Sequence, residues 1–285
     1  MPRLTKIILL AISVGILSVL WRDTFDSKLL SGAHVLLTGA SRGIGEQMAY
    51  HYARFGSELV ITARNKTLLN QVAEKCLQLG ARKVFLISAD LADPEGADRV
   101  VQFALEKLGS LDYLVLNHIG YVSLLMWNGN AEQTRSLMQV NFLSYVQMTA
   151  AALPSLTKTN GSIIVISSIC GKLAIPFAAS YSATKFALGG FFNSLRYELK
   201  LQKKNVSITL CILGLIDTES AMKETRDKGI VNKDAYPASD ASLEIIKGGA
   251  VRAQEIYCPW KWKLILLIKE WSTLLTDWII LSKFN

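Results

Sequence analysis

Cysteine and charge are both scarce in this sequence, and their scarcity excludes several classes of protein. The chain has four cysteines, which form neither a Cys-x-x-Cys pair nor a metal-site spacing, so we predict no bound metal: Cys76, Cys170, Cys211 and Cys258. We expect these thiols to be buried as small hydrophobic side chains. Charged residues make up 19% and hydrophobic residues 51% of the 285 residues, which excludes a disordered chain and fits one large α/β domain with appendages.

Dense basic clusters are also missing, although the net charge is +8. The lysines and arginines are dispersed along the chain, so nucleic acid is not an expected partner. Attraction to a membrane surface is compatible with this charge.

No apolar run near the N-terminus reaches the roughly 20 residues of a typical membrane-spanning helix. The run 7–20 follows Arg3 and Lys6, a pattern typical of a targeting segment. Because no small-x-small cleavage pattern precedes Trp21, we predict an uncleaved signal anchor over residues 1–24, with a cleaved signal peptide as the alternative. Positive charge before the run predicts a cytosolic N-terminus and a main domain in the lumen of the endoplasmic reticulum, or a secreted protein if the segment is removed.

Three Asn-x-Ser/Thr sequons fit a glycoprotein on that side of the membrane, and they begin at Asn65, Asn160 and Asn205. Each sequon is short enough to arise by chance. The alternative for any one of them is an unmodified asparagine.

Strand-like and helix-like segments alternate from residue 34 to 211, without an internal repeat or a second-domain linker. Aliphatic runs predict strands at 34–37, 58–64, 83–88, 111–116, 162–168 and 206–210. Amphipathic runs predict helices at 46–55, 68–79, 96–108, 134–153 and from 181 onward. The alternation predicts an α/β fold, a doubly wound, mainly parallel Rossmann-type sheet with helices on both faces, in a domain of residues 25–255. The charged segment 219–240 predicts a lid over the substrate.

The Gly-x-Gly-x-x-Gly fingerprint is absent, but another glycine-rich turn, 38–45, lies between the first predicted strand and the first predicted helix. Gly39, Gly43 and Gly45 would let the backbone approach a pyrophosphate, whose charge is favoured by the free amides of a helix N-terminus. The turn therefore predicts a dinucleotide site.

A carboxylate is missing at the end of the second predicted strand, where an NAD-binding protein presents one to the ribose diol. Arg64 stands there instead, and with Arg42 it could clamp a ribose 2′-phosphate. The two arginines favour NADP(H) over NAD, although either one alone could be an exposed residue at a helix start.

Tyr181 and Lys185 are four residues apart, which puts both side chains on one face of a helix. A fixed ammonium favours the phenolate, so Tyr181 is a candidate general acid/base and Lys185 the group that lowers its pKa. Ser168 ends the predicted strand 162–168 and could hydrogen-bond a substrate oxygen. Taken alone, the Tyr-x-x-x-Lys pattern is also typical of a solvated lysine beside a packed ring.

Two polar residues stand out in apolar surroundings. Asn141 interrupts the predicted helix 134–153 and predicts a specific hydrogen-bond partner. His118 follows the predicted strand 111–116, and without a second ligand nearby we interpret it as a hydrogen-bonded packing residue rather than a metal ligand or a base.

These motifs occur together and in order, and over roughly residues 30–255 the chain resembles the short-chain dehydrogenase/reductase family. The resemblance implies an NADP(H)-dependent oxidoreductase that transfers a hydride between the nicotinamide and a hydroxyl or ketone. It implies that Tyr181 is the acid/base and that Lys185 also bonds the nicotinamide ribose. It further implies that Ser168 orients the substrate oxygen, beside Tyr181, and that Asn141 anchors a proton-relay water.

The resemblance also implies a set of cofactor contacts, with Asp90 at the adenine ring and Thr218 near the nicotinamide amide. The full set implied for the cofactor is Gly39, Ser41, Arg42, Gly43, Ile44, Gly45, Arg64, Asp90, Leu91, Asn117, His118, Ile119, Tyr181, Lys185, Gly214, Ile216 and Thr218.

Within the family, segments 117–119, 140–145 and 213–218 resemble the 11β-hydroxysteroid dehydrogenases, which implies an 11-oxygenated steroid as substrate. Ile175 stands where the type 1 enzyme has a tyrosine before the proline, and this removes a polar and aromatic contact from the substrate loop. A retinol or other lipid carbonyl reductase is the alternative enzyme. A cofactor-binding scaffold without turnover is the alternative outside enzymes.

The tail 256–285 is rich in tryptophan and lysine. Its apolar residues recur at helical spacing and predict one apolar stripe, formed by Leu264, Leu267, Ile268, Trp271, Leu274, Leu275 and Trp278. Such a helix packs on the domain or across a homodimer interface, or it lies in a membrane surface. The two arrangements can coexist in a dimer that rests on the bilayer.

Overall fold

A computed structural model describes residues 25–122, 124–227 and 235–271 of the chain. Its centre is a seven-stranded sheet in the order β3-β2-β1-β4-β5-β6-β9, and every strand pair in it is parallel. The strands are β1 (His34–Thr38), β2 (Glu58–Ala63), β3 (Lys83–Ser88), β4 (Tyr113–Leu116), β5 (Ser162–Ser168), β6 (Ser207–Leu213) and β9 (Glu255–Cys258). The predicted doubly wound sheet is confirmed. The strand order reverses between β1 and β4, which is the switch point where such sheets bind ligands.

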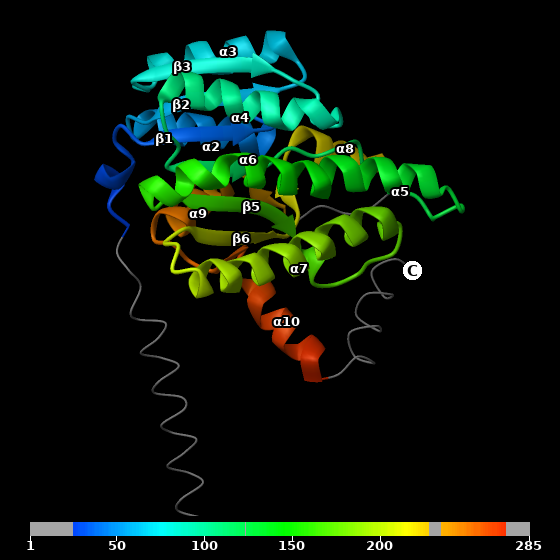
Figure 1. Cartoon of the computed structure of the whole chain (residues 1–285). Helices are drawn as coiled ribbons and strands as arrows, with labels where there is room; N and C mark the ends of the chain where they lie inside the picture. The colour runs from blue at the N-terminus through cyan, green and yellow to red at the C-terminus, as the bar shows by residue number, and fades with distance from the viewer. Residues whose placement is uncertain (1–24, 123, 228–234, 272–285) are drawn as a thin grey trace, which may run out of the picture.

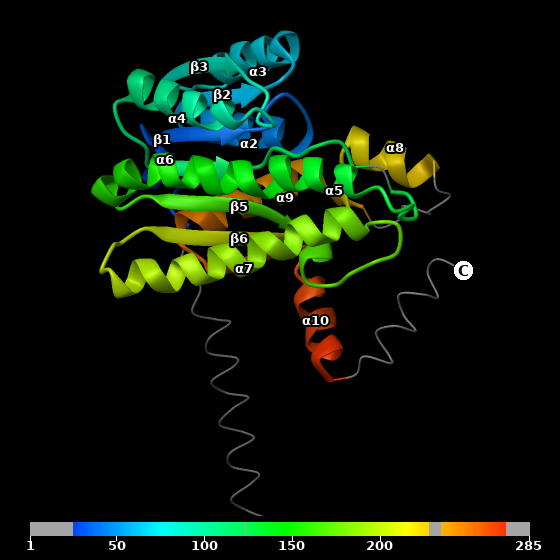
Figure 2. The same cartoon turned by 45° about the vertical axis from the view of Figure 1, so that its right-hand side comes forward.

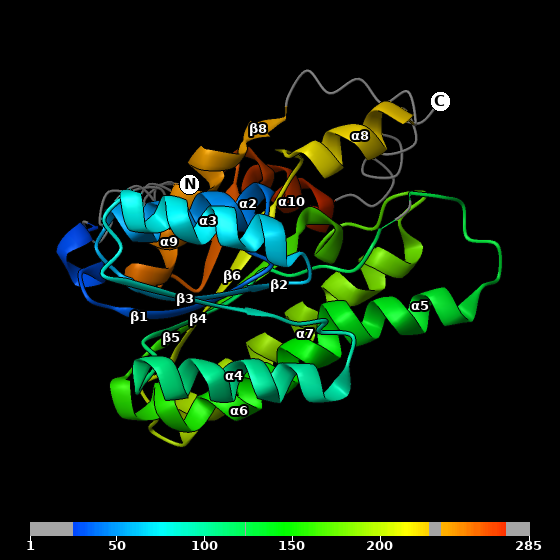
Figure 3. The ribbon, with the colours of Figure 1, turned by 90° about the horizontal axis from the view of Figure 1, so that it is seen from above.

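Helices cover both faces of this sheet, as Figure 3 shows from above. One face carries α2 (Gly43–Arg54), α3 (Lys66–Gln78) and α9 (Ala238–Ala250), and the other carries α4 (Pro94–Leu108), α6 (Ser144–Thr159) and α7 (Ala179–Leu201). Successive strand residues point to opposite faces, so Leu36 joins one buried cluster and Leu37 the other. The two clusters form a core on each side of the sheet, and the strand ends hold the site between these layers.

The predicted helix over 134–153 is interrupted. It consists of α5 (Ala131–Met138), one π-helical turn η2 (Gln139–Leu143) and the start of α6. The wider π turn carries the fully buried Asn141, whose inward side chain is the physical reason for the irregularity.

The remaining elements lie around the ends of the sheet. They are the 3-10 turns η1 (Ser27–Leu30) and η3 (Ile169–Gly171), the short pair β7 (Ile216–Asp217) and β8 (Tyr236–Pro237), and the helices α8 (Glu219–Asp227) and α10 (Lys261–Trp271). The segment predicted as a lid, 219–240, therefore contains α8, β8 and the start of α9. Figures 1 and 2 show α5 and α8 at the end of the sheet to which the strand arrows point, and α10 projecting from the side of the sheet where β6 and β9 lie.

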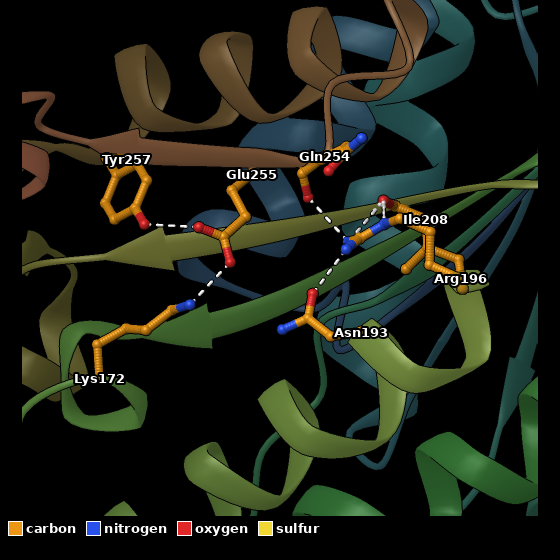
Figure 4. Close-up of polar contacts among 7 residues, drawn as sticks. All are labelled: Lys172, Asn193, Arg196, Ile208, Gln254, Glu255 and Tyr257. Carbon is orange, nitrogen blue, oxygen red and sulfur yellow. Dashed lines mark hydrogen bonds and ion pairs between the residues drawn. The ribbon is translucent and has the colours of Figure 1, made fainter.

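The edge strand β9 is fastened by a polar cluster (Figure 4). The guanidinium of Arg196, on α7, donates to the carbonyls of Ile208 and Gln254, at 3.0 Å from Nη2 in both cases. Glu255 accepts hydrogen bonds from Lys172 Nζ at 2.7 Å and from Tyr257 Oη at 2.6 Å. The sheet thus continues through Cys258, and the domain boundary predicted at residue 255 falls on the first residue of β9.

The predicted signal segment, residues 1–24, lies outside the described residues, as does the tail after 271. Within 25–122, 124–227 and 235–271, no helix is both long and apolar enough to cross a membrane. The expected burial of the cysteines is confirmed, because all four thiols are buried and free.

Candidate active site

The carboxyl ends of β1, β4, β5 and β6 bring the predicted motifs to one edge of the sheet. The glycine turn follows β1, Asn117 and His118 follow β4, Ser168 ends β5, and Gly214 follows β6. Parallel strands deliver these segments together although they are up to about 180 residues apart in the chain.

The glycine turn is shaped by contacts that exclude side chains. Gly39 and Gly43 have φ of +65° and +59°, a region that favours glycine. A Cβ on Gly45 would lie 2.1 Å from the carbonyl oxygen of Gly39. Close packing of the turn on α2 therefore requires these residues.

The start of α2 fits an anionic ligand. Asn65, Asp93 and Asn130 cap α3, α4 and α5 with side-chain hydrogen bonds, whereas Arg42 makes none at the start of α2. The first amides of α2 are thus left for an external acceptor, as a diphosphate requires. Ser41 and Ile44, which belong to the same turn, are partly buried. The residues present fit the dinucleotide that the sequence predicts.

The adenosine side of the predicted site is more open. Arg42 and Arg64 are both exposed, the first at the start of α2 and the second directly after β2. Asp90 is exposed and accepts the amide of Ala92 at 3.0 Å, while Leu91 is buried. The two arginines therefore reach solvent where a ribose phosphate would enter.

Asn117 and His118 are joined to β1 through Thr38. The Asn117 amide group donates to the carbonyls of Thr38 and Gly39, both at 3.1 Å. His118 places Nδ1 at 2.9 Å from Thr38 Oγ1 and Nε2 at 2.7 Å from Ser144 Oγ. This confirms our interpretation of His118 as a hydrogen-bonded packing residue. Burial lowers its pKa to about 3, so the ring is neutral at physiological pH.

The predicted partner of Asn141 is found on the segment after β4. Asn141 Oδ1 accepts the backbone amide of Gly120 at 2.8 Å, and Nδ2 lies 3.4 Å from Thr184 Oγ1. The residue links the neighbouring Ile119, which is exposed, to the helix that carries Tyr181. Ser144 and Thr184 were not predicted from the sequence, because hydroxyls on helices carry no spacing signal.

Ser168 and Tyr181 meet at the end of β5. Ser168 Oγ accepts the amide of Cys170 at 3.2 Å, and its hydroxyl interacts with the Tyr181 phenol. Burial raises the pKa of Tyr181 above its ordinary value, and the bond to Ser168 lowers it only in part. The expectation that Lys185 lowers this pKa is not met, because burial dominates and the ammonium is engaged elsewhere.

Lys185 is buried beneath the site. Its Nζ donates to the carbonyl of Ile166 at 2.8 Å and lies 5.7 Å from the centre of the Tyr181 ring. Burial lowers its pKa to about 8. An ammonium has three donors, so donors remain for hydroxyl groups of a ligand.

The segment from Gly214 to Thr218 closes the site on the β6 side. Ile216 is buried in β7, and Thr218 follows it. A Cβ on Gly43 would lie 3.1 Å from Thr218 Cγ2, so this segment touches the glycine turn. The predicted residues at 43 and 218 are therefore brought together.

A small pocket opens beside Tyr181, with a volume of ≈ 50 Å³. Phe177 lines one wall, and exposed side chains of the segment after β4, including Met126 and Trp127, line the other. Tyr121 Oη, on the same segment, lies 3.3 Å from Glu224 Oε1, so α8 contacts the segment after β4. Within the described residues, no three His, Cys, Asp or Glu side chains are grouped to hold a metal.

Comparison with known proteins identifies the family. Residues 33–229 match the family model described as short chain dehydrogenase. A relative from Gallus gallus, named hydroxysteroid 11-beta-dehydrogenase 1-like protein, is 61% identical over 245 residues, covering 86% of this chain and 85% of the relative. A protein of the same name from Danio rerio is 52% identical over 286 residues, covering 100% of this chain and 99% of the relative.

Solved structures share the fold. A short chain dehydrogenase/reductase from Burkholderia phymatum, in complex with NAD, superposes with a TM-score of 0.77 at 19% identity, covering 86% of this chain and 95% of the other. An alcohol dehydrogenase from Thermococcus sibiricus, complexed with 5-hydroxy-NADP, gives 0.66 at 25% identity, covering 78% and 94%. The predicted family is confirmed: the chain belongs to the short-chain dehydrogenases and is an oxidoreductase that acts on CH–OH groups with a nicotinamide cofactor.

Proposed function

We propose that this protein is an NADP(H)-dependent hydroxysteroid dehydrogenase, which interconverts a hydroxyl and a ketone at the 11-position of a steroid. The observation that carries the proposal is the convergence of Ser168, Tyr181 and Lys185 beside an uncapped glycine turn. The names of the relatives that match nearly the whole chain support the steroid as substrate.

In this proposal a bound nicotinamide supplies or accepts the hydride. Tyr181 exchanges the proton with the substrate oxygen. In reduction the phenol donates its proton to the oxygen that becomes the hydroxyl, and in oxidation the phenolate takes that proton back. The Ser168 hydroxyl, which interacts with Tyr181, donates to the same oxygen and holds it in place.

Lys185 and Asn141 assist this proton transfer without contacting the substrate oxygen themselves. The Lys185 ammonium keeps donors for the ribose hydroxyls after its bond to Ile166. Asn141 lies between Gly120 and Thr184, where it would anchor a water that relays the proton.

The preference for NADP(H) rests on Arg42 and Arg64, which are exposed at the adenosine side. Arg64→Asp should reduce the preference for NADP over NAD by about tenfold or more, because a charge-assisted phosphate contact is replaced by repulsion. Arg99→Asp, on the exposed face of α4, is the matched control. Unchanged preference in Arg64→Asp would contradict this placement of the 2′-phosphate.

A lipid carbonyl reductase is the second candidate, and Ile175 favours it. This side chain is apolar and packs against the core near the substrate side, so it offers no polar contact to orient a steroid. Purified full-length protein should reduce cortisone with NADPH faster than it reduces retinaldehyde. Turnover of retinaldehyde alone would support the second candidate, and cofactor binding without any turnover would support a scaffold.

We infer a lumenal position in the endoplasmic reticulum, held by the N-terminal segment and by the tail. Trp260 and Leu264 are 67% and 51% exposed, so the start of α10 presents apolar surface to a bilayer.

The sequon asparagines Asn65, Asn160 and Asn205 are all exposed. Glycosidase treatment of the protein from cells should increase its gel mobility, and deletion of 260–285 should weaken liposome binding once residues 1–24 are removed. Loss of dimer with unchanged liposome binding would contradict the membrane role of the tail.

We also infer a homodimer. Phe186, Tyr197 and Leu201 on α7 are 44%, 64% and 84% exposed, an amount of apolar surface that suits a partner helix. Sedimentation of Tyr197→Glu should show a shift from dimer to monomer, and an unchanged sedimentation coefficient would contradict this interface.

A further inference from the structure

The indole of Trp262, on α10, lies directly against the backbone of Gly214. A Cβ on Gly214 would stand 2.1 Å from Nε1, 2.9 Å from Cδ1 and 3.0 Å from Cε2 of this indole. No side chain larger than hydrogen fits between them in this arrangement. The contact joins the C-terminal helix to the turn after β6, although the matched family region ends at residue 229.

Gly214 begins the segment that reaches the glycine turn. Its amide donates to the carbonyl of Cys258 at 2.8 Å, and the next carbonyl, of Leu215, accepts the amide of Tyr236 at 2.9 Å. The segment then passes through β7 to Thr218, whose methyl group lies against Gly43. Trp262 thus supports one end of a segment whose other end touches the start of α2.

The indole is well placed to hold this segment. Trp262 is partly buried and packs, with Leu266, against the core cluster that contains β5 and β6 residues. Its neighbour Trp260 is 67% exposed. Trp260 is therefore a tryptophan of the same chain region that is mostly exposed, and it serves as the control for Trp262.

We propose that Trp262 is a positioning residue that holds the Gly214–Thr218 segment against the glycine turn. Through this contact α10 increases the affinity of the protein for the dinucleotide. The inference rests on the proposed function, since it assumes that the dinucleotide lies along the glycine turn. Truncation of the indole leaves a void under Gly214 and lets the segment move away, which weakens cofactor binding without touching the proton-transfer residues.

The test is an equilibrium titration of the full-length protein with NADPH, followed by direct excitation of the nicotinamide so that loss of a tryptophan does not affect the signal. Trp262→Ala should raise the Kd for NADPH by about tenfold and the KM for NADPH in parallel, with kcat at saturating cofactor within about twofold of wild type. Trp262→Phe should restore most of the affinity, and Trp260→Ala should bind as wild type does. Equal affinity in Trp262→Ala and wild type, or equal losses in Trp260→Ala and Trp262→Ala, would overturn the inference.

Gly214→Ala provides a second arm that does not depend on how Trp262→Ala folds. The new methyl group collides with the indole, so this variant alone should also weaken NADPH binding. In the double variant Gly214→Ala/Trp262→Ala the collision is gone, and its loss of affinity should be smaller than the sum of the single losses. Wild-type affinity in Gly214→Ala would overturn the inference. Wild-type protein that fails to bind NADPH at all would instead contradict the proposed function.

Discussion

His118 is buried and neutral at the site, and this makes the folded protein less stable in acid. His118 is held between Thr38 and Ser144 by both ring nitrogens, and its ring lies 4.5 Å from that of Tyr145, centre to centre. Burial, with a smaller contribution from the charge of Lys185, holds the pKa at about 3 instead of 6.5. A charged imidazolium would be both desolvated and close to an ammonium.

We therefore predict acid destabilisation that depends on His118. In the unfolded chain His118 is protonated below about pH 6.5, whereas in the folded protein it stays neutral down to about pH 3. The unfolded state therefore binds one more proton in this window, and the free energy of unfolding decreases as the pH falls. The loss due to His118 is about 2 kcal/mol at pH 5. Urea unfolding at pH 7.5, 6 and 5 should show a shallower pH dependence in His118→Gln than in wild type. Identical slopes in wild type and His118→Gln would refute this.

The raised pKa of Tyr181 predicts opposite pH responses for the two directions of the reaction. Oxidation needs the phenolate, whose fraction rises about tenfold per pH unit below the pKa, whereas reduction uses the phenol, which predominates up to and beyond neutral pH. Initial rates at saturating substrates should show oxidation rising between pH 6 and 8 and reduction nearly constant. An oxidation rate that does not change over this range would show that Tyr181 is not the base.

At the scale of elements, α7 links the catalytic pair to the edge of the sheet. Its first turns carry Tyr181 and Lys185, and further along the helix Arg196 is 6% exposed and bonded to carbonyls from β6 and from the residue before β9. The position of Tyr181 therefore depends on a contact about four helical turns away.

Replacement of Arg196 tests this anchor. Arg196→Met removes every donor and takes away the guanidinium partner of the Ile208 carbonyl, while the Gln254 carbonyl keeps the amide of Leu210. This should lower the free energy of unfolding by about 2–4 kcal/mol. Arg196→Lys keeps the charge and one donor group but loses the planar fork, so its loss should be smaller. Urea unfolding at neutral pH measures both. Wild-type stability in Arg196→Met would mean that the carbonyls are satisfied in another way.

Element boundaries show where prediction from the sequence stops. Strands β1 to β6 were predictable because each contains a short run of aliphatic residues, such as 163–166 in β5. The π turn at Asn141 was not predictable in form, because a single polar residue signals a partner but not the backbone change that accommodates it. From the sequence, most of β9 is assigned to the tail 256–285. The strand has only four residues, Glu255–Cys258, and such a short pattern does not distinguish a strand from a linker.

At the scale of the whole molecule, the predicted site residues gather because the fold is parallel. Local motifs predicted the glycine turn, Ser168 and the Tyr181/Lys185 pair, and the topology then determined that they meet. Tertiary contacts between residues that belong to no sequence motif as a pair could not be predicted. Thr38 and Ser144 hold His118, and Trp262 covers Gly214, through long-range packing that no sequence spacing encodes.

The central claim is that Tyr181 moves the proton for a hydride transfer on a steroid oxygen. The most direct measurement compares wild type with Tyr181→Phe in single-turnover reduction of cortisone, with NADPH binding measured on the same samples. We predict unchanged NADPH affinity within about twofold and a rate lowered by about 10²–10⁴-fold, which is the range of general acid/base catalysis. Turnover by Tyr181→Phe at the wild-type rate, with NADPH bound, would contradict the account.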